Sequence, residues 1–524
     1  MPISSSRRSF SKAALTFTGS LSAKISITAA LCSLANECSG TTIHPLQFGA
    51  TGDGTTDDTV ALQRAVTAAI TQNRILDLGR ETYRVRRSII GEGDIRIINS
   101  SGAVILASPG EYSEFGVLVL RGRAVSAGRL LASVAQSQMK LSIARTDQFS
   151  PGDVGAIYNP EDYSFSRLRR YYRAGEFFDV DRVEARSLSL TAPLSDGYRQ
   201  GAVEVARVEP ITGYVRDIEI RSQGGPESLI VIDYADGFEL TNPVLRGAIN
   251  SAVVISRSMR CRVIRPNIEN VGAGGDDYGV VFSNSQNCRL SGGKIFARRH
   301  PVAIGGADQP NCVPCRDIVI RQAILRNDLA SGVHSADLHG NTEKCGYDGC
   351  VIFGGFSPQG RDSFIINCTI HAMSIGTAIY GAELLGGHHL IERNEFHFVA
   401  DPSKSSRGAI DFGGNSDAIT ASTVETLTIK VRRNTFFSSN FSQNTMLLYA
   451  RNAGTSQKVN IDLTDNKIMV NRYHSFVLLR HSKGVARSEF VNIARNRASF
   501  RAETALYLDG DYSKLAQLKG AAVN

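Results

Sequence analysis

The segment Phe48-Gly-Ala-Thr-Gly-Asp-Gly-Thr-Thr-Asp-Asp58 is rich in glycine and aspartate, a composition typical of a turn. Thr56 or Asp57 can cap a helix that follows it. Apolar side chains then recur at helical spacing and predict one apolar helix face, made of Val60, Ala61, Ala65, Val66, Ala69 and Ile70. The stretch 74–85 indicates two short strands around a turn. A turn, a helix and a strand pair are therefore expected to open the fold.

This order of elements over residues 46–85 resembles the N-terminal signature of the pectate-lyase-like right-handed parallel β-helix superfamily. The resemblance lies in the phrase FGATGDGTTDDT, the helix after it and the strand around Thr82-Tyr83-Arg84-Val85. It implies an all-β fold, a single-stranded right-handed parallel β-helix whose first rung is plugged by an N-terminal capping helix. The match is specific to the superfamily but not to one activity.

A repeated phrase predicts a coil independently of that resemblance. From about residue 237, an apolar strand is followed by a small or amide residue, one variable residue, and Ile or Phe. The instances are Pro266-Asn-Ile268, Gly293-Lys-Ile295, Gln322-Ala-Ile324, Cys350-Val-Ile352, Cys368-Thr-Ile370, Asn394-Glu-Phe396, Asn434-Thr-Phe436, Asn466-Lys-Ile468 and Asn496-Arg-Ala498. A phrase that recurs along the chain in this way is typical of a solenoid, and the unequal intervals between its instances indicate loops that differ in length. We expect each rung to bury its apolar residue on the next rung, about 4.8 Å away.

The first position of the phrase predicts ladders of like side chains. Asn occupies it at 394, 434, 466 and 496, and stacked amides can hydrogen-bond to one another along the coil. Cys350 and Cys368 occupy the same position, and a second register holds Cys261, Cys288 and Cys345. We expect these cysteines to act as small buried apolar residues. Cys312 and Cys315 stand apart as a loop pair, for which a disulfide and half of a zinc site are the alternatives.

The chain is divided into five segments by its composition. Residues 1–35 resemble a twin-arginine export signal, with Arg7-Arg8 before a moderately apolar stretch, which predicts a periplasmic or secreted protein. Residues 36–120 are expected to form the cap and first rungs, 121–215 an inserted antiparallel β-subdomain, 216–510 the remaining rungs, and 511–524 a tail. A chance arginine pair in a Ser-rich terminus is the alternative to the signal.

Charge and composition narrow the partners. The 524 residues contain 58 Lys and Arg against 50 Asp and Glu, for a formal net charge of +8. Because the basic residues are scattered, an acidic polysaccharide fits this charge and no nucleic acid partner is expected. No apolar run reaches the length needed to cross a membrane, so no membrane-spanning segment is expected once the signal is removed. The chain contains no Trp, so a sugar site would depend on Tyr, Phe, Arg and His. A monomer and a homotrimer both remain open.

Polar side chains are densest over residues 272–345. The candidate catalytic residues form three groups: Asp276 and Asp277; Arg299 and His300; and Asp337, His339 and Glu343. A carboxylate beside a histidine can orient the ring and set its tautomer, so these groups could perform acid–base chemistry. A Gly-rich turn is the alternative for the paired Asp, and loop packing is the alternative for His300.

Substrate-binding residues are predicted on the same strands and in the subdomain. Alternation along the strands that follow each Ile or Phe turn places His334, Tyr380 and Asp411 outward. The loop 158–178 carries Tyr171, Tyr172 and Arg173, which could stack on sugars or hold carboxylates. A solvated loop is the alternative there.

Two further resemblances bear on activity. Asp276-Asp277 with His300-Pro-Val-Ala-Ile-Gly-Gly306 is similar to part of the polygalacturonase signature, in which paired Asp serve as acid and base. The Asn-x-Asp and Arg-x-Lys motifs of that family are missing here, which disfavours that activity. Residues 240–400 also resemble phage tailspike proteins.

These observations predict an exported protein that cleaves a polysaccharide, with a lyase slightly favoured over a hydrolase. A non-catalytic binding or adhesion coil and a phage tailspike-like protein are the alternatives. We expect no metal ligands and no cofactor, with Ca²⁺ as an option for a lyase.

Overall fold

The computed structural model describes residues 42–112, 116–160, 174–272, 277–306, 312–328, 334–358, 360–372, 375–380, 387–398, 408–413, 427–438, 448–450, 458–470, 475–480, 487–498, 504–509 and 518–519. The chain divides into two compact units, Met1–Thr42 and Ile43–Asn524, and the described elements from Ile43 onward belong to the second. The predicted export signal, the loop residues Tyr171, Tyr172 and Arg173, and Asp276 lie outside the described residues.

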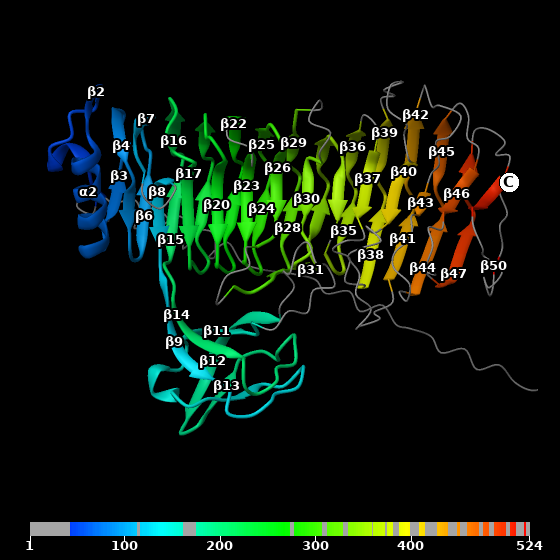
Figure 1. The fold of residues 1–524 in the computed structure, drawn as a ribbon. Coiled ribbons are helices and arrows are strands. Elements are labelled where there is room, and N and C mark those ends of the chain that lie inside the picture. The colour runs from blue at the N-terminus through cyan, green and yellow to red at the C-terminus, as the bar shows by residue number, and fades with distance from the viewer. Residues whose placement is uncertain are drawn as a thin grey trace, which may run out of the picture. The chain divides into compact units, whose positions relative to one another are not determined.

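Most strands of the second unit belong to three parallel sheets, which are called sheets A, B and C here (Figure 1). Successive strands of the chain lie in sheet A, then sheet B, then sheet C. Within the described residues, sheet A has fifteen strands in the order β1 (Thr42–Ile43), β3 (Ile75–Asp77), β6 (Ile95–Ile98), β15 (Gly213–Arg216), β18 (Glu239–Thr241), β21 (Arg262–Ile264), β24 (Arg289–Ser291), β28 (Val319–Arg321), β32 (Gly346–Asp348), β35 (Phe364–Ile366), β38 (Gly387–Glu392), β41 (Leu427–Arg432), β44 (Lys458–Thr464), β47 (Arg487–Ala494) and β50 (Leu518–Lys519).

Sheet B has, over the same described ranges, fourteen strands: β2 (Asp53–Asp57), β4 (Thr82–Arg87), β7 (Val104–Glu111), β16 (Glu219–Ser222), β19 (Val244–Arg246), β22 (Asn267–Val271), β25 (Lys294–Ala297), β29 (Ile324–Arg326), β33 (Val351–Phe353), β36 (Thr369–Ala372), β39 (Glu395–Phe398), β42 (Thr435–Ser438), β45 (Lys467–Val470) and β48 (Arg497–Ala498). Sheet C has thirteen in the part of the chain that is described: β5 (Ile89–Gly91), β8 (Gly116–Arg121), β17 (Ser228–Asp233), β20 (Ser251–Ser256), β23 (Tyr278–Ser283), β26 (His300–Ile304), β30 (Ala336–Leu338), β34 (Phe356–Pro358), β37 (Ile375–Tyr380), β40 (Gly408–Gly413), β43 (Leu448–Ala450), β46 (Ser475–Arg480) and β49 (Thr504–Asp509).

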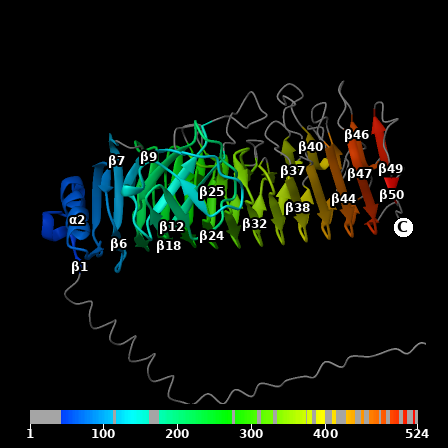
Figure 2. The ribbon, with the colours of Figure 1, turned by 90° about the horizontal axis from the view of Figure 1, so that it is seen from below.

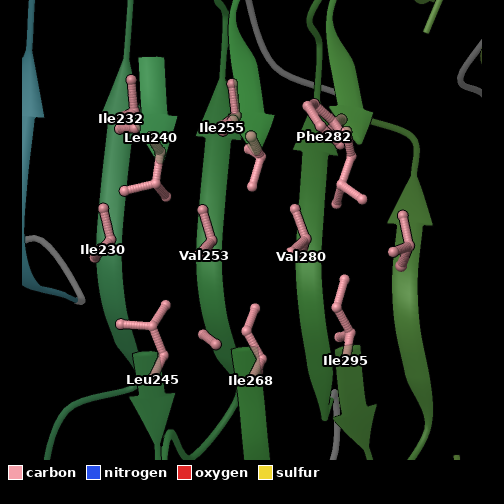
Figure 3. Packing of buried hydrophobic residues seen from close by; sticks show 14 of the residues in the cluster. Ile230, Ile232, Leu240, Leu245, Val253, Ile255, Ile268, Val280, Phe282 and Ile295 are labelled. Carbon is pink, nitrogen blue, oxygen red and sulfur yellow. The ribbon is translucent and has the colours of Figure 1, made fainter. Parts of the chain in front are cut away.

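The core lies inside the coil, where like positions of successive rungs stack. In sheet C, Val253 pairs in register with Val280, and Ile255 pairs with Phe282. All four side chains are fully buried, and Figure 3 shows them facing the same interior as the apolar residues of sheets A and B. Burying one such side chain contributes roughly 1.5–3 kcal/mol, and the repeat supplies several in each rung. The predicted parallel β-helix is therefore confirmed.

One rung of the repeated phrase was assigned wrongly. The phrase Gln322-Ala-Ile324 predicts that Ile324 faces the core, but Ile324 is 39% exposed and Leu325 is fully buried. Leu325 pairs in register with Ile295 and Ile352, the core residues of the neighbouring rungs. Because Ile and Leu are adjacent here, apolarity alone does not reveal which of them faces inward.

A left-handed residue bends the chain between sheets A and B. In the last described rungs this residue is Arg393, Arg433, Asp465 and Arg495, with φ between 55° and 58°. The next position in each rung is the predicted asparagine ladder, which is confirmed. The amide nitrogens of Asn394, Asn434 and Asn466 each donate to the amide oxygen of the next rung's Asn, at 3.0, 3.0 and 2.9 Å.

Helix α2 (Thr59–Thr71) packs its buried residues Leu62, Ala65 and Val66 into the first rungs. This confirms the predicted capping helix. Val60 is 47% exposed, so its predicted place on the apolar face is wrong. Asp58, rather than Thr56 or Asp57, occupies the position before the helix, and its carboxylate accepts hydrogen bonds from the backbone of Thr51 and Gly52.

Among the described residues, an antiparallel sheet of six strands lies between β8 and β15 in the sequence. It contains β9 (Arg123–Arg129), β10 (Lys140–Ser142), β11 (Val154–Tyr158), β12 (Gly175–Glu184), β13 (Ser187–Leu190) and β14 (Glu204–Glu209) in the order β10-β13-β12-β11-β14-β9. This is the predicted inserted subdomain, which Figure 1 shows beside the coil and Figure 2, viewed from below, shows overlapping it. Its apolar core contains Ile157, Leu188 and Val205.

Charged clamps hold this subdomain to the coil. The Arg260 guanidinium bonds the carboxylates of Asp236 in the coil and Asp179 in β12. Arg316, which is 3% exposed, donates to Asp196 of the subdomain at 2.7 Å. Because buried charges are costly to separate, the Arg316 contact fixes the subdomain near the rungs that carry the candidate site, whereas the exposed Arg260 contact contributes less.

The seven described cysteines are all buried and free. Cys261, Cys288, Cys345, Cys350 and Cys368 lie in the core of the coil, as predicted. Cys312 and Cys315 form no disulfide, and Cys315 is itself a core residue. The described helices include none with the length and apolarity needed to cross a membrane.

Candidate functional site

The candidate site lies on strands β23, β26 and β30 of sheet C, which are neighbours in register. Asp337 stands between Ala336 and Leu338, whose side chains are fully buried in the core. Because side chains alternate along a strand, Asp337 lies on the outer face of the sheet. It is nevertheless only 4% exposed, so this carboxylate is covered by neighbouring groups.

Asp337 and His339 form a carboxylate–imidazole pair. The Nε2 atom of His339 lies 2.8 Å from Oδ2 of Asp337. Burial opposes ionisation of Asp337, but His339 and then His300 outweigh it, so the pKa of Asp337 lies well below its ordinary value. An ionised carboxylate accepts the Nε2–H of the ring, and Nδ1 is then the basic nitrogen of neutral His339. The sequence predicted this pairing from two residues that share strand parity.

His300 approaches the same carboxylate from the preceding rung. Its Nε2 lies 3.8 Å from Asp337 Oδ2, and its Nδ1 lies 2.5 Å from the carbonyl oxygen of His334. Only an N–H can pair with a carbonyl, so Nδ1 carries the proton. Burial lowers the pKa of His300 below its ordinary value, against the opposing effect of Asp337. Two imidazoles therefore flank one buried carboxylate.

Tyr278 is a component of the cluster that the sequence prediction missed. Its ring stacks on His300, with centroids 5.4 Å apart and planes inclined by 25°. The Arg299 guanidinium lies 5.6 Å from the Tyr278 ring centre, and its Nη1 lies 3.4 Å from the phenol oxygen. Tyr278 pairs in register with His300. Register is the signal that could have found it, because Tyr278 stands two positions before core residue Val280, as His300 does before Val302.

Asp277 shapes the entry to β26. Its backbone carbonyl accepts hydrogen bonds from the amides of Arg299 and His300 at 3.3 and 3.2 Å. Its backbone is left-handed, with φ 55°, and its carboxylate lies 4.0 Å from Arg298. The turn that was given as the alternative for this residue is therefore present.

Glu343 is drawn into a different set of contacts. It lies on β31 (Thr342–Glu343), which pairs with β27 (Cys315–Arg316), and its carboxylate accepts from Arg316 Nε at 2.8 Å. Burial opposes ionisation, but Arg316 outweighs it and lowers the pKa of Glu343. Since Arg316 also bonds Asp196, Glu343 belongs to the clamp between coil and subdomain.

His334, which was predicted to point outward, is largely buried in the structure. His334 is only 8% exposed and shares strand parity with the core residues Ala336 and Leu338. Burial lowers the pKa of His334 to about 4. His334 lies two positions before the first residue of β30, so the alternation of side chains along that strand does not fix its orientation.

Two further predicted binding residues lie on later strands. Tyr380 ends β37 and Asp411 lies in β40, where it pairs in register with Ala378. Their side chains lie outside the described part of the chain. Within the described ranges, no group of three or more His, Cys, Asp and Glu side chains is arranged to hold a metal ion. The absence of a cofactor stays a prediction.

Comparisons with known proteins agree with the fold. A family model described as Gp49, pectin lyase-like, matches residues 260–483. The crystal structure of the tailspike protein gp49 from Pseudomonas phage LKA1 is similar at 28% identity and a TM-score of 0.79, over 90% of this chain and 82% of that chain.

Two further tailspikes are similar in fold. Gp61 of Pseudomonas phage phi297 has 24% identity and a TM-score of 0.72, over 90% of this chain and 81% of that chain. Gp54 of Acinetobacter baumannii phage AP22, solved with a capsular saccharide, has 22% identity and a TM-score of 0.74, over 92% of this chain and 79% of that chain.

A curated relative matches a shorter stretch. The glucan 1,3-beta-glucosidase of Cochliobolus carbonum is 34% identical over 117 residues, which are 21% of this chain and 14% of that protein. Together with the three sheets, these likenesses confirm the resemblance to the pectate-lyase-like parallel β-helix superfamily.

Proposed function

We propose that this protein cleaves a polysaccharide at the cluster formed by Asp337, His339, His300 and Arg299. The observation that carries the proposal is the Asp337–His339 pair, a buried carboxylate 2.8 Å from an imidazole on the outer face of sheet C. A parallel sheet exposes its side chains in rows, which suits an extended polymer. The 34% identity to a glucan 1,3-beta-glucosidase over 117 residues supports a polysaccharide as the ligand.

A lyase route fits the described charges better than hydrolysis. Hydrolysis by paired carboxylates needs one of them as acid and the other as base or nucleophile. Here Asp337 is held ionised by histidines, and Glu343 is held by Arg316. In β-elimination, a histidine can take the proton next to a uronate carboxylate while a guanidinium neutralises that carboxylate.

His339 suits the role of base better than His300. The side chain of His339 is 19% exposed and that of His300 is 6% exposed. In the proposed reaction the C–H bond breaks, His339 Nδ1 takes the proton, a C=C bond forms and the glycosidic C–O bond breaks. The departing oxygen takes up a proton from water. Arg299 binds the carboxylate of the sugar.

A panel of acidic and neutral polysaccharides tests this proposal. Elimination gives an unsaturated product that absorbs ultraviolet light, and hydrolysis gives new reducing ends without that absorbance. We expect absorbance from an acidic polymer and its loss in His339→Ala. The control is His388→Ala, which removes an exposed histidine on β38. Full activity of the His339 variant would overturn the site, and reducing ends alone would overturn the lyase route.

The second candidate is a tailspike-like protein that binds a polysaccharide without cleaving it. The whole-chain likeness to the LKA1 tailspike favours this candidate. The binding protein would be favoured over the cleaving enzyme if a polymer binds but no substrate gives either ultraviolet absorbance or new reducing ends.

A further inference from the structure

We propose a second saccharide site at the N-terminal end of the coil, which takes a sugar bearing a carboxylate. A cavity of about 620 Å³ lies between helix α2 and the ends of β4 and β7. Its walls include Val60, Gln63 and Arg64 from the helix, Arg87 from β4, and Glu111 and Tyr112 at the end of β7. This volume lies within the range of roughly 300–1,000 Å³ that is usual for small-ligand sites.

The floor of this cavity is held by hydrogen bonds within the protein. The Gln63 amide donates to the Ile90 carbonyl and accepts from the Ile90 amide, both at 2.8 Å. The Tyr112 hydroxyl donates to the Val85 or Ser108 carbonyl, at 2.9 or 2.7 Å. Burial raises the pKa of Tyr112 to about 12, so the phenol is neutral. These residues form a preorganised surface.

Arg64 and Arg87 supply the charge that selects the ligand. Both side chains are exposed, and among the described residues neither guanidinium makes a side-chain hydrogen bond or ion pair. The adjacent arginines differ, because Arg84 donates to Ser108 at 3.0 Å and Arg86 donates to the Pro109 carbonyl at 3.2 Å. Guanidinium groups bind carboxylates in a bidentate manner, so an anionic ligand fits two such groups on one cavity.

The remaining wall favours a sugar over a bare anion. Val60 is 47% exposed, and the half-buried Tyr112 ring lines the same cavity. Apolar and aromatic surface of this kind covers the C–H face of a sugar ring, whereas a small inorganic anion leaves it in contact with water. Glu111 pairs in register with Arg87 and opposes a negative ligand. The site is therefore expected to bind weakly.

Titration with D-glucuronate and D-glucose, followed by ligand-observed NMR, tests this proposal, because the two sugars differ only at C6. We expect at least a 10-fold preference for glucuronate and at least a 10-fold loss of its affinity in the Arg64→Ala, Arg87→Ala double variant. Arg80→Ala is the matched control, since its 86% exposed side chain lies outside the cavity lining. Glu111→Gln should tighten binding, because it removes the opposing charge.

The outcome is independent of cleavage at sheet C. His339→Ala should bind glucuronate as the unmodified protein does. Equal affinity for both sugars, no binding of glucuronate, or unchanged binding by the double variant would overturn the proposal. Loss of binding in His339→Ala would also overturn it, by placing the ligand on sheet C.

Discussion

Asn434 lies inside the asparagine ladder and offers a direct test of what holds the late rungs together. Its amide nitrogen donates to the Ile391 carbonyl and to Asn466 Oδ1, at 2.9 and 3.0 Å. Its amide oxygen accepts from the backbone and side-chain nitrogens of Asn394, at 2.9 and 3.0 Å. Asn434→Ala removes these four bonds. At about 1 kcal/mol net for each bond, the free energy of unfolding should fall by about 4 kcal/mol.

Hydrogen exchange in the native state is the suitable assay, because a repetitive coil can open rung by rung. Peptides covering β42 and β45 should exchange faster in Asn434→Ala by a factor that corresponds to this loss. The control is Asn492→Ala, which removes a partly exposed amide with one bond to Asp462 at 2.8 Å and should change the free energy by less than about 1 kcal/mol. Equal exchange in the two variants would refute the assignment of stability to the ladder.

Four further outcomes are expected. Asp337→Asn should lower the rate of polymer cleavage by about 10²–10⁴-fold at unchanged fold, because the amide no longer stabilises a protonated base; this is measured on whichever polymer is cleaved. The pKa of His334 is about 4 in the folded protein, below the unfolded value of about 6.5. The free energy of unfolding should therefore fall by about 3 kcal/mol as the pH drops from 7 to 4. In His334→Asn, the urea midpoints at pH 7 and pH 4 should differ less than they do in the unmodified protein. Arg316→Met should make the inserted subdomain more sensitive to limited proteolysis, since it removes the bond at 2.7 Å to Asp196 of the subdomain and leaves Glu343 buried without its partner. Leu325→Ala should cost about 2–5 kcal/mol in urea unfolding and Ile324→Ala should cost far less, because only Leu325 faces the core.

The fold could be predicted because its signals repeat. The phrase at 48–59 and the recurring apolar positions agree with one another, and an error in one rung does not disturb the rest. The misassigned rung at Ile324 illustrates the limit of this approach. Hydrophobic pattern specifies that a strand has a buried face, and register with neighbouring rungs specifies which residues form it.

Local parity and the density of polar residues predicted Asp337, His339, Arg299 and His300, but not the partners that complete their surroundings. Asp337 and His339 are two residues apart, so their proximity follows from the strand itself. Tyr278 and Arg316 depend on partners in other rungs or in the subdomain, so their contacts are set by the length of every loop in between. Glu343 appeared available in the sequence because its partner Arg316 is 27 residues away.

The left-handed bend before the asparagine ladder makes the coil extensible. Arg393, Arg433, Asp465 and Arg495 all adopt this bend although their side chains differ, so it does not depend on a single residue type. Each ladder amide bonds only to its neighbouring rungs. A duplicated copy of residues 434–465 would bring its own bend, amide and core residue. The number of rungs in the coil can therefore be changed without altering the chemistry at Asp337.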